Sequence, residues 1–230
     1  MGLPVVLVTG QLLTAAVWQP LLPALADHDV LIADNHSAET IADYAQRLLD
    51  EAPPRFALVA HAMGGFIAFE VLRRAPERVA RLVLISTLAS ADGPAQTARR
   101  QGYIDLVEAG KFDAVVEERI PILFPPNRPN DPELLRIARQ MAAETGAETF
   151  LRQQRALMAR IDSRPGLPEI TAPTLLIWGD GDGITSLEQH EEMAALIPGA
   201  RLAVIAGAGH LPMLEEPEQV AALVAGFIGS

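Results

Sequence analysis

A chain of 230 residues, half of them hydrophobic, is long enough to form one domain with a sizeable core. The net charge of −11 excludes nucleic acid and anionic membrane surfaces as partners, since both would repel the protein. The absence of cysteine excludes disulfides and thiolate metal sites. We find no secretory leader and no run near the roughly 18 apolar residues of a membrane span, so we expect a cytoplasmic protein.

The first part of the chain alternates short apolar runs with amphipathic segments. The apolar runs are rich in branched residues, as expected for strands buried on both faces of a parallel sheet. Predicted strands cover 4–9, 30–34, 56–60 and 79–86, and predicted helices lie around 18–22 and over 38–50 and 66–75.

The pattern changes between about residues 90 and 168, where no strand-like run occurs. Apolar residues at helical spacing predict helices over 95–109, 111–120, 132–145 and 147–161. A proline-rich break covers 121–130. We interpret 90–168 as a helical cap over the carboxyl edge of the sheet.

Alternation resumes in the last part of the chain. Predicted strands cover 174–178 and 200–205, and predicted helices cover 187–197 and 217–228. Helical crossovers make consecutive strands parallel, so the predicted fold is α/β, a doubly wound, mostly parallel sheet of about six strands. Residues 1–89 and 169–230 would form the core of this single domain, with 90–168 inserted as the cap.

One stretch, Phe56–Ala68, joins a short strand to a helix through a tight turn of small residues. The residue at the apex of such a turn has strained dihedrals, and its neighbours must pack closely. Ala60, Gly64 and Gly65 supply the small neighbours and leave Ala62 at the apex. This spacing is typical of a nucleophile elbow.

The stretch resembles the elbow of the α/β-hydrolase family, which usually reads G-x-S-x-G. Ala60 replaces the first glycine, a mild change, whereas Ala62 replaces the serine and removes the nucleophile. Trp178–Ile184 resembles the acid loop of the family, which places Asp182 as the acid with Asp180 as its rival. Ala206–Leu211 matches G-x-G-H, so the resemblance makes His210 the base.

The order of elbow, acid and histidine is the one expected for this fold. The resemblance assigns the oxyanion hole to the main-chain N–H groups of Gln11 and Met63. The resemblance implies a serine hydrolase that acts on carboxylic esters. The same residue set also serves thioesters, lactones and amides.

We expect the pocket walls to come from apolar residues of the loops and the cap. The candidates are Leu12, Met63, Tyr103, Phe124, Met158, Ile184 and Leu211. With no arginine on a catalytic loop, these residues favour a neutral, apolar, small to medium ester-like substrate. No cofactor and no metal site is predicted, and the oligomeric state is not indicated by the sequence.

Ala62 leaves two interpretations open. Either serine is the natural residue and this chain is an inactivated form, or alanine is native. A native alanine would fit serine-independent His-Asp chemistry, as in proteins resembling cofactor-free dioxygenases or lyases, or a ligand-binding pseudoenzyme. The first interpretation is favoured because the acid, the base, the oxyanion loop and the small elbow residues all remain.

Overall fold

The computed structural model describes residues 2–126 and 131–229. Its centre is a sheet of six strands in the order β2-β1-β3-β4-β5-β6, and every neighbouring pair is parallel. The strands are β1 (Val5–Val8), β2 (Val30–Ile32), β3 (Phe56–His61), β4 (Val79–Ile85), β5 (Thr174–Gly179) and β6 (Arg201–Ile205). The predicted doubly wound sheet is confirmed.

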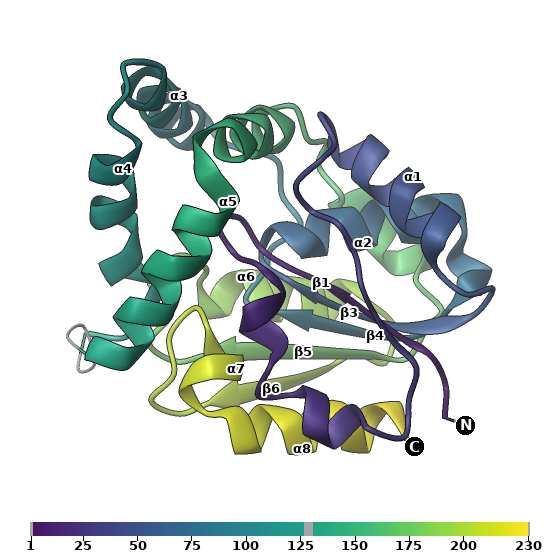
Figure 1. Ribbon diagram of the computed structural model, residues 1–230. Coiled ribbons are helices and arrows are strands. Elements are labelled where there is room, and N and C mark those ends of the chain that lie inside the picture. The colour runs from purple at the N-terminus through teal and green to yellow at the C-terminus, as the bar shows by residue number, and fades with distance from the viewer. Residues whose placement is uncertain (1, 127–130, 230) are drawn as a thin grey trace.

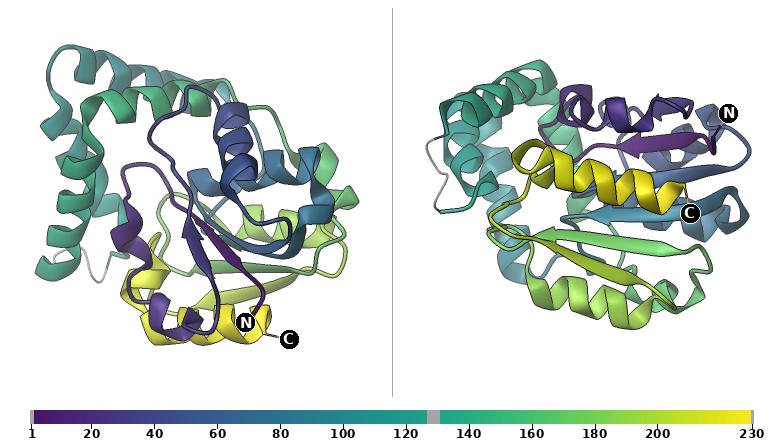
Figure 2. Two further views of the ribbon diagram at one scale, coloured as in Figure 1. Left: turned by 45° about the vertical axis from the view of Figure 1, so that its right-hand side comes forward. Right: turned by 90° about the horizontal axis from the view of Figure 1, so that it is seen from below.

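Helices cover both faces of this sheet (Figure 2). Alternate residues of each strand point to opposite faces, so Val5 and Leu7 join one core cluster and Val6 and Val8 the other. One face packs against α1 (Ile41–Glu51), α2 (Met63–Arg74) and α6 (Leu187–Leu196). The opposite face packs against the 3₁₀ turns η1 (Ala15–Trp18) and η2 (Leu22–Leu25) and helix α8 (Pro217–Ile228). Shorter elements are η3 (Pro76–Arg78), η5 (Arg164–Glu169) and α7 (Pro212–Glu215).

Most of the segment between β4 and β5, residues 94–158, is helical and lies beyond the carboxyl ends of the strands (Figure 1). It contains α3 (Pro94–Glu108), α4 (Phe112–Arg119), η4 (Ile120–Leu123) and α5 (Pro132–Met158). Two helices were expected over 132–145 and 147–161, and α5 indeed consists of two helical stretches that meet at Gly146, where φ of 74° and ψ of 165° are not helical. Part of the proline-rich break, 127–130, lies outside the described residues.

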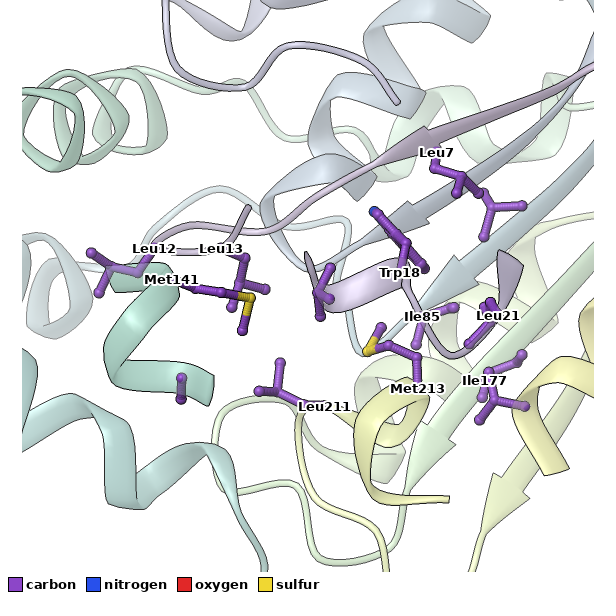
Figure 3. Packing of buried hydrophobic residues seen from close by; sticks show 14 of the residues in the cluster. Leu7, Leu12, Leu13, Trp18, Leu21, Ile85, Met141, Ile177, Leu211 and Met213 are labelled. Atoms are coloured by element: carbon purple, nitrogen blue, oxygen red, sulfur yellow. The ribbon is translucent and has the colours of Figure 1, made fainter. Parts of the chain in front are cut away.

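One hydrophobic cluster joins the sheet to both the terminal helix and the helical segment (Figure 3). Trp18 is fully buried in this cluster together with Leu211 and Met213. The carboxyl edge of the sheet is therefore fixed by packing from several elements, which gives a rigid base for the loops that follow β1, β3, β5 and β6. None of the helices among the described residues is long and apolar enough to cross a membrane. The cytoplasmic location stays a prediction.

Candidate functional site

Ala62 forms the apex of the turn between β3 and α2. Its φ of 48° and ψ of −111° lie outside the regions that L-residues normally occupy, a conformation that costs on the order of 1–3 kcal/mol. The surrounding residues hold it there: the Ala62 N–H donates to the Ile85 carbonyl at 3.0 Å, and the Ala62 carbonyl accepts from Thr87 Oγ1 at 2.8 Å. The strained elbow geometry is therefore present although the apex residue is alanine.

The two glycines after the apex are required by close packing. A Cβ at Gly64 would collide with the main-chain carbonyl of Val8, and one at Gly65 would collide with the Thr87 side chain. The first turn of α2 can thus approach β1 and the loop after β4 closely. This close approach explains why the sequence has small residues at these positions.

The acid and the histidine meet at the carboxyl ends of β5 and β6. His210 Nδ1 lies 2.9 Å from Asp182 Oδ2 and 3.0 Å from Oδ1. Asp180, the rival acid, instead accepts from the Gly207 N–H at 2.7 Å. Asp182 is therefore the carboxylate that contacts the histidine, as the sequence predicted in preference to Asp180.

The surroundings of Asp182 keep it ionised. Burial alone would raise the pKa of Asp182, but the nearby His210 and the hydrogen bonds that Asp182 accepts outweigh burial and hold the pKa below its usual range. Those bonds come from His210, from the Thr185 hydroxyl at 2.5 Å and from the Ile184 N–H at 2.8 Å. An ionised Asp182 bound to Nδ1 would orient the imidazole and leave Nε2 for proton transfer.

Four hydrogen bonds fix the loop that carries His210. The His210 N–H donates to the Leu123 carbonyl of η4 at 2.7 Å, and the His210 carbonyl accepts from His61 Nε2 at 2.8 Å. The buried carboxylate of Glu215 accepts from the N–H groups of Gly209 at 2.9 Å and Leu211 at 3.1 Å. Burial, followed by the His210 charge, lowers the pKa of His61 to about 3, so His61 is neutral.

Sequence reasoning missed the role of Glu215. The pair Glu215–Glu216 resembles a solvated acidic face in the sequence, and that interpretation is wrong for Glu215. His190 is also fully buried, with Nδ1 2.9 Å from the Ser186 carbonyl.

A cavity of about 80 Å³, here called the elbow cavity, lies beside Ala62. Its lining includes Gln11, Ala62, Met63, Arg119, Ile184 and His210. Among the described residues, no hydrogen bond uses the main-chain N–H of Gln11 or Met63. Both residues line the cavity and keep these amides unpaired, as an oxyanion hole requires, and the assignment to such a hole stays a prediction.

Of the predicted wall residues from the loops and cap, the structure brings Met63 and Ile184 to the elbow cavity. The others lie elsewhere: Leu12, Leu211 and Phe124 are buried in the core, and Met158 is partly buried outside the cavity lining. The Tyr103 hydroxyl donates to Glu118 at 3.0 Å.

The helical segment also contributes two arginines, Arg100 and Arg119, which sequence reasoning did not select. The signal available for Arg119 was its position at the end of a predicted helix, directly before the proline-rich break.

A larger cavity of about 550 Å³ lies between α1, α2 and η5. Phe66 lines both cavities, but Ala62, Asp182 and His210 are not part of the lining of the larger one. Its charged groups have partners of their own, such as Glu70 with Arg73 at 2.6 Å and Arg160 with Asp92 at 2.6 Å. The described residues contain no group of three His, Asp or Glu side chains placed to hold a metal ion.

Comparisons with known proteins agree with this geometry. The model of the alpha/beta hydrolase family matches residues 5–223. A pimeloyl-[acyl-carrier protein] methyl ester esterase of Photobacterium profundum is 29% identical over 99% of this chain and 95% of its own. A putative carbamate hydrolase of Azorhizobium caulinodans is 30% identical over 99% of this chain and 92% of its own.

Solved structures give the same result. The malate-bound structure of a thermophilic esterase from Thermogutta terrifontis superposes with a TM-score of 0.90 at 29% identity, covering 100% of this chain and 92% of its own. The enol-lactonase from Burkholderia xenovorans has the same fold, with a TM-score of 0.88 at 23% identity over 100% of this chain and 93% of its own. With its fold, its elbow and the match of the family model to nearly its whole length, the chain belongs to the alpha/beta hydrolase family.

Proposed function

We propose that this chain is a carboxylic ester hydrolase whose reaction needs serine at position 62, and that the form with Ala62 binds its ester substrate without turning it over. The observation that supports this most is the pairing of His210 with Asp182 beside the strained elbow. A protein that merely binds ligands has no need to keep a buried acid-histidine pair next to an apex residue in this conformation. The esterases among the relatives support the ester class.

The chemistry follows from the positions of these groups. In the Ala62→Ser variant, the hydroxyl would attack the ester carbonyl while His210 Nε2 takes its proton. The N–H groups of Gln11 and Met63 would stabilise the negative oxygen that forms, and His210 would return the proton to the departing alcohol. Water, activated by the same histidine, would then release the acid.

Turnover of short alkyl esters by this chain and by Ala62→Ser tests the proposal. We expect serine to raise kcat/KM by several orders of magnitude, because losing such a nucleophile costs on the order of a millionfold. The double variant Ala62→Ser with His210→Ala is the control, and its kcat/KM should be as low as that of the Ala62 chain. An Ala62→Ser variant that is folded but inactive on all esters would contradict the proposal.

A serine-independent function is the second candidate, and Ala62 itself is the observation that favours it. Native His-Asp chemistry, of the kind seen in cofactor-free dioxygenases or lyases, would depend on His210 but not on serine. Oxygen uptake or ligand binding by the Ala62 chain that is lost in His210→Ala and unaffected by Ala62→Ser would support this candidate instead.

A further inference from the structure

Arg119 brings a positive charge into the elbow cavity without a carboxylate to balance it. It is the last residue of α4 and lines the same cavity as Ala62 and His210. Among the described residues Arg119 forms no ion pair. Arg100, which lines the same cavity, differs because its Nε lies 2.6 Å from Asp92 Oδ2.

The donors around Arg119 are only partly used. Arg119 Nη2 donates to Gln11 Oε1 at 3.2 Å, whereas Arg119 Nε and Gln11 Nε2 are buried with no partner among the described residues. The guanidinium Cζ lies 5.1 Å from the centroid of the Tyr103 ring and 5.8 Å from that of Phe150. These cation–π contacts hold the guanidinium beside the two rings, and a side-chain hydrogen bond with Tyr103 uses part of its donor capacity. Both unpartnered atoms are donors with almost no exposed surface, so the ligand that satisfies them is an acceptor that the two side chains turn to meet.

The local charge favours an anion. Burial, and after it the charges of Arg100 and Arg99, lower the pKa of Arg119 to about 10, while Tyr103 opposes the shift. Arg119 is therefore protonated at neutral pH. A buried charge without a partner is costly, and a bound anion removes that cost.

We propose that Arg119 and Gln11 bind a carboxylate on the acyl part of the substrate, so that the substrate is a half-ester of a short dicarboxylic acid. This inference rests on the proposed function, because it places the ester carbonyl in the oxyanion hole. Gln11 connects the two sites: its main-chain N–H belongs to that hole, and its side chain contacts Arg119. The carboxylate therefore lies only a few bonds from the ester carbonyl, which suits the small cavity.

This proposal replaces the expectation of a neutral substrate. That expectation considered only the catalytic loops, and the arginine comes from the helical segment. A guanidinium forms two parallel hydrogen bonds with a carboxylate, and a neutral methyl group in the same place would leave the donors unpartnered.

Calorimetric binding to the chain as it stands, with Ala62, tests the carboxylate site without relying on catalysis. Monomethyl succinate and methyl valerate are matched in length and differ in the terminal carboxylate. We expect monomethyl succinate to bind about tenfold to a hundredfold more tightly, and Arg119→Gln to abolish that difference. Arg119→Lys should keep only part of it, because lysine lacks the planar fork.

Arg136→Gln is the matched control, since it removes an exposed arginine of α5 that pairs with Glu133 at 2.8 Å. It should leave the preference for monomethyl succinate unchanged. Equal binding of the two esters, or an unchanged preference in a folded Arg119→Gln protein, would overturn the proposal. Inorganic phosphate is a third probe: if it competes for Arg119 as tightly as monomethyl succinate, the site binds any small anion and the half-ester assignment is wrong.

Turnover by Ala62→Ser separates this proposal from the proposed function. Hydrolysis of both esters with equal kcat/KM would leave the esterase in place and overturn the carboxylate site. If neither ester is hydrolysed although the Ala62 chain binds monomethyl succinate through Arg119, the carboxylate site stands and the esterase assignment fails. A preference of about tenfold or more in kcat/KM that depends on Arg119 supports both.

Discussion

Glu215 is a single buried carboxylate that holds the main chain on both sides of His210. Its two oxygens accept from the N–H groups of Gly209 and Leu211. In Glu215→Gln one oxygen becomes an NH₂ group, which cannot accept, so one of these buried N–H groups loses its partner. We expect the free energy of unfolding to fall by about 1–3 kcal/mol, measured by urea denaturation.

The same change should act on catalysis through His210. Introduced into Ala62→Ser, Glu215→Gln is expected to lower kcat more than it raises KM, because it displaces the base and leaves the cavity walls in place. Glu191→Gln, which changes an exposed glutamate of α6, is the matched control and should alter neither quantity. Unchanged stability and kcat in Glu215→Gln would show that the carboxylate does not position the loop.

Individual site residues were predictable where a short motif carried them. Asp182 and His210 each follow a strand within a glycine-rich loop, and the structure brings them into contact. Arg119 and Glu215 are not part of any motif, and the partial burial of Arg119 and the burial of Glu215 depend on packing between distant segments. A sequence shows that a residue is charged but not that its neighbours leave it buried.

At the scale of elements, the turn after α4 rests directly on the loop of His210. The Leu123 carbonyl accepts from the His210 N–H, and a Cβ at Gly209 would lie 2.6 Å from that carbonyl oxygen and 2.9 Å from Pro125. Gly209→Ala therefore has to push η4 and the loop apart. We expect a loss of about 1–3 kcal/mol in unfolding free energy, and a lower kcat in the Ala62→Ser background.

Gly102→Ala is the control for this prediction. Gly102 lies within α3, and an added Cβ there meets nothing within 4 Å. Alanine should stabilise the helix by roughly 0.5–1 kcal/mol, the opposite sign to Gly209→Ala. If Gly209→Ala were as stable as the unmodified chain, the contact between η4 and the His210 loop would not be a close one.

Element types were easier to predict than their details. Apolar runs predicted all six strands, although the expected burial on both faces holds for the central strands and not for the edge strands β2 and β6, which are partly exposed. The break within α5 was predicted at the right residue, because Gly146 interrupts the apolar pattern and has non-helical dihedrals. The helix near Trp18 became two 3₁₀ turns, η1 and η2. The division into core and cap at residues 90 and 168 stays a prediction.

At the scale of the whole molecule, buried histidines make stability depend on pH. The pKa of His61 is about 3 in the folded chain and about 6.5 when unfolded. Between these values only the unfolded chain binds the proton, so the free energy of unfolding falls as the pH falls, by at most about 1.4 kcal/mol per pH unit from this group. Burial lowers the pKa of His190 as well, which adds to the effect in the same direction.

Asp182 contributes in a different pH range. Its pKa is lowered by folding, so the stability it provides is present above about pH 4, the usual value for aspartate, and is lost as the pH falls below that. Between pH 6.5 and 4.5 the contribution of Asp182 is nearly constant, and the loss measured there comes largely from the histidines. Over that range we expect the free energy of unfolding to fall by about 2 kcal/mol less in His61→Gln than in the parent chain. The reason is that a glutamine amide can donate to the His210 carbonyl without binding a proton.

Urea denaturation at several pH values across this range, followed by circular dichroism, measures the slope directly. His36→Gln removes a histidine that is only partly buried, in the loop after β2, and is the matched control for the loss of one imidazole. Parallel slopes for the parent chain and His61→Gln would mean that the buried imidazole is protonated without unfolding. A flatter slope in His61→Gln alone would show that His61 stays neutral in the folded chain and that its protonation on unfolding produces the pH dependence.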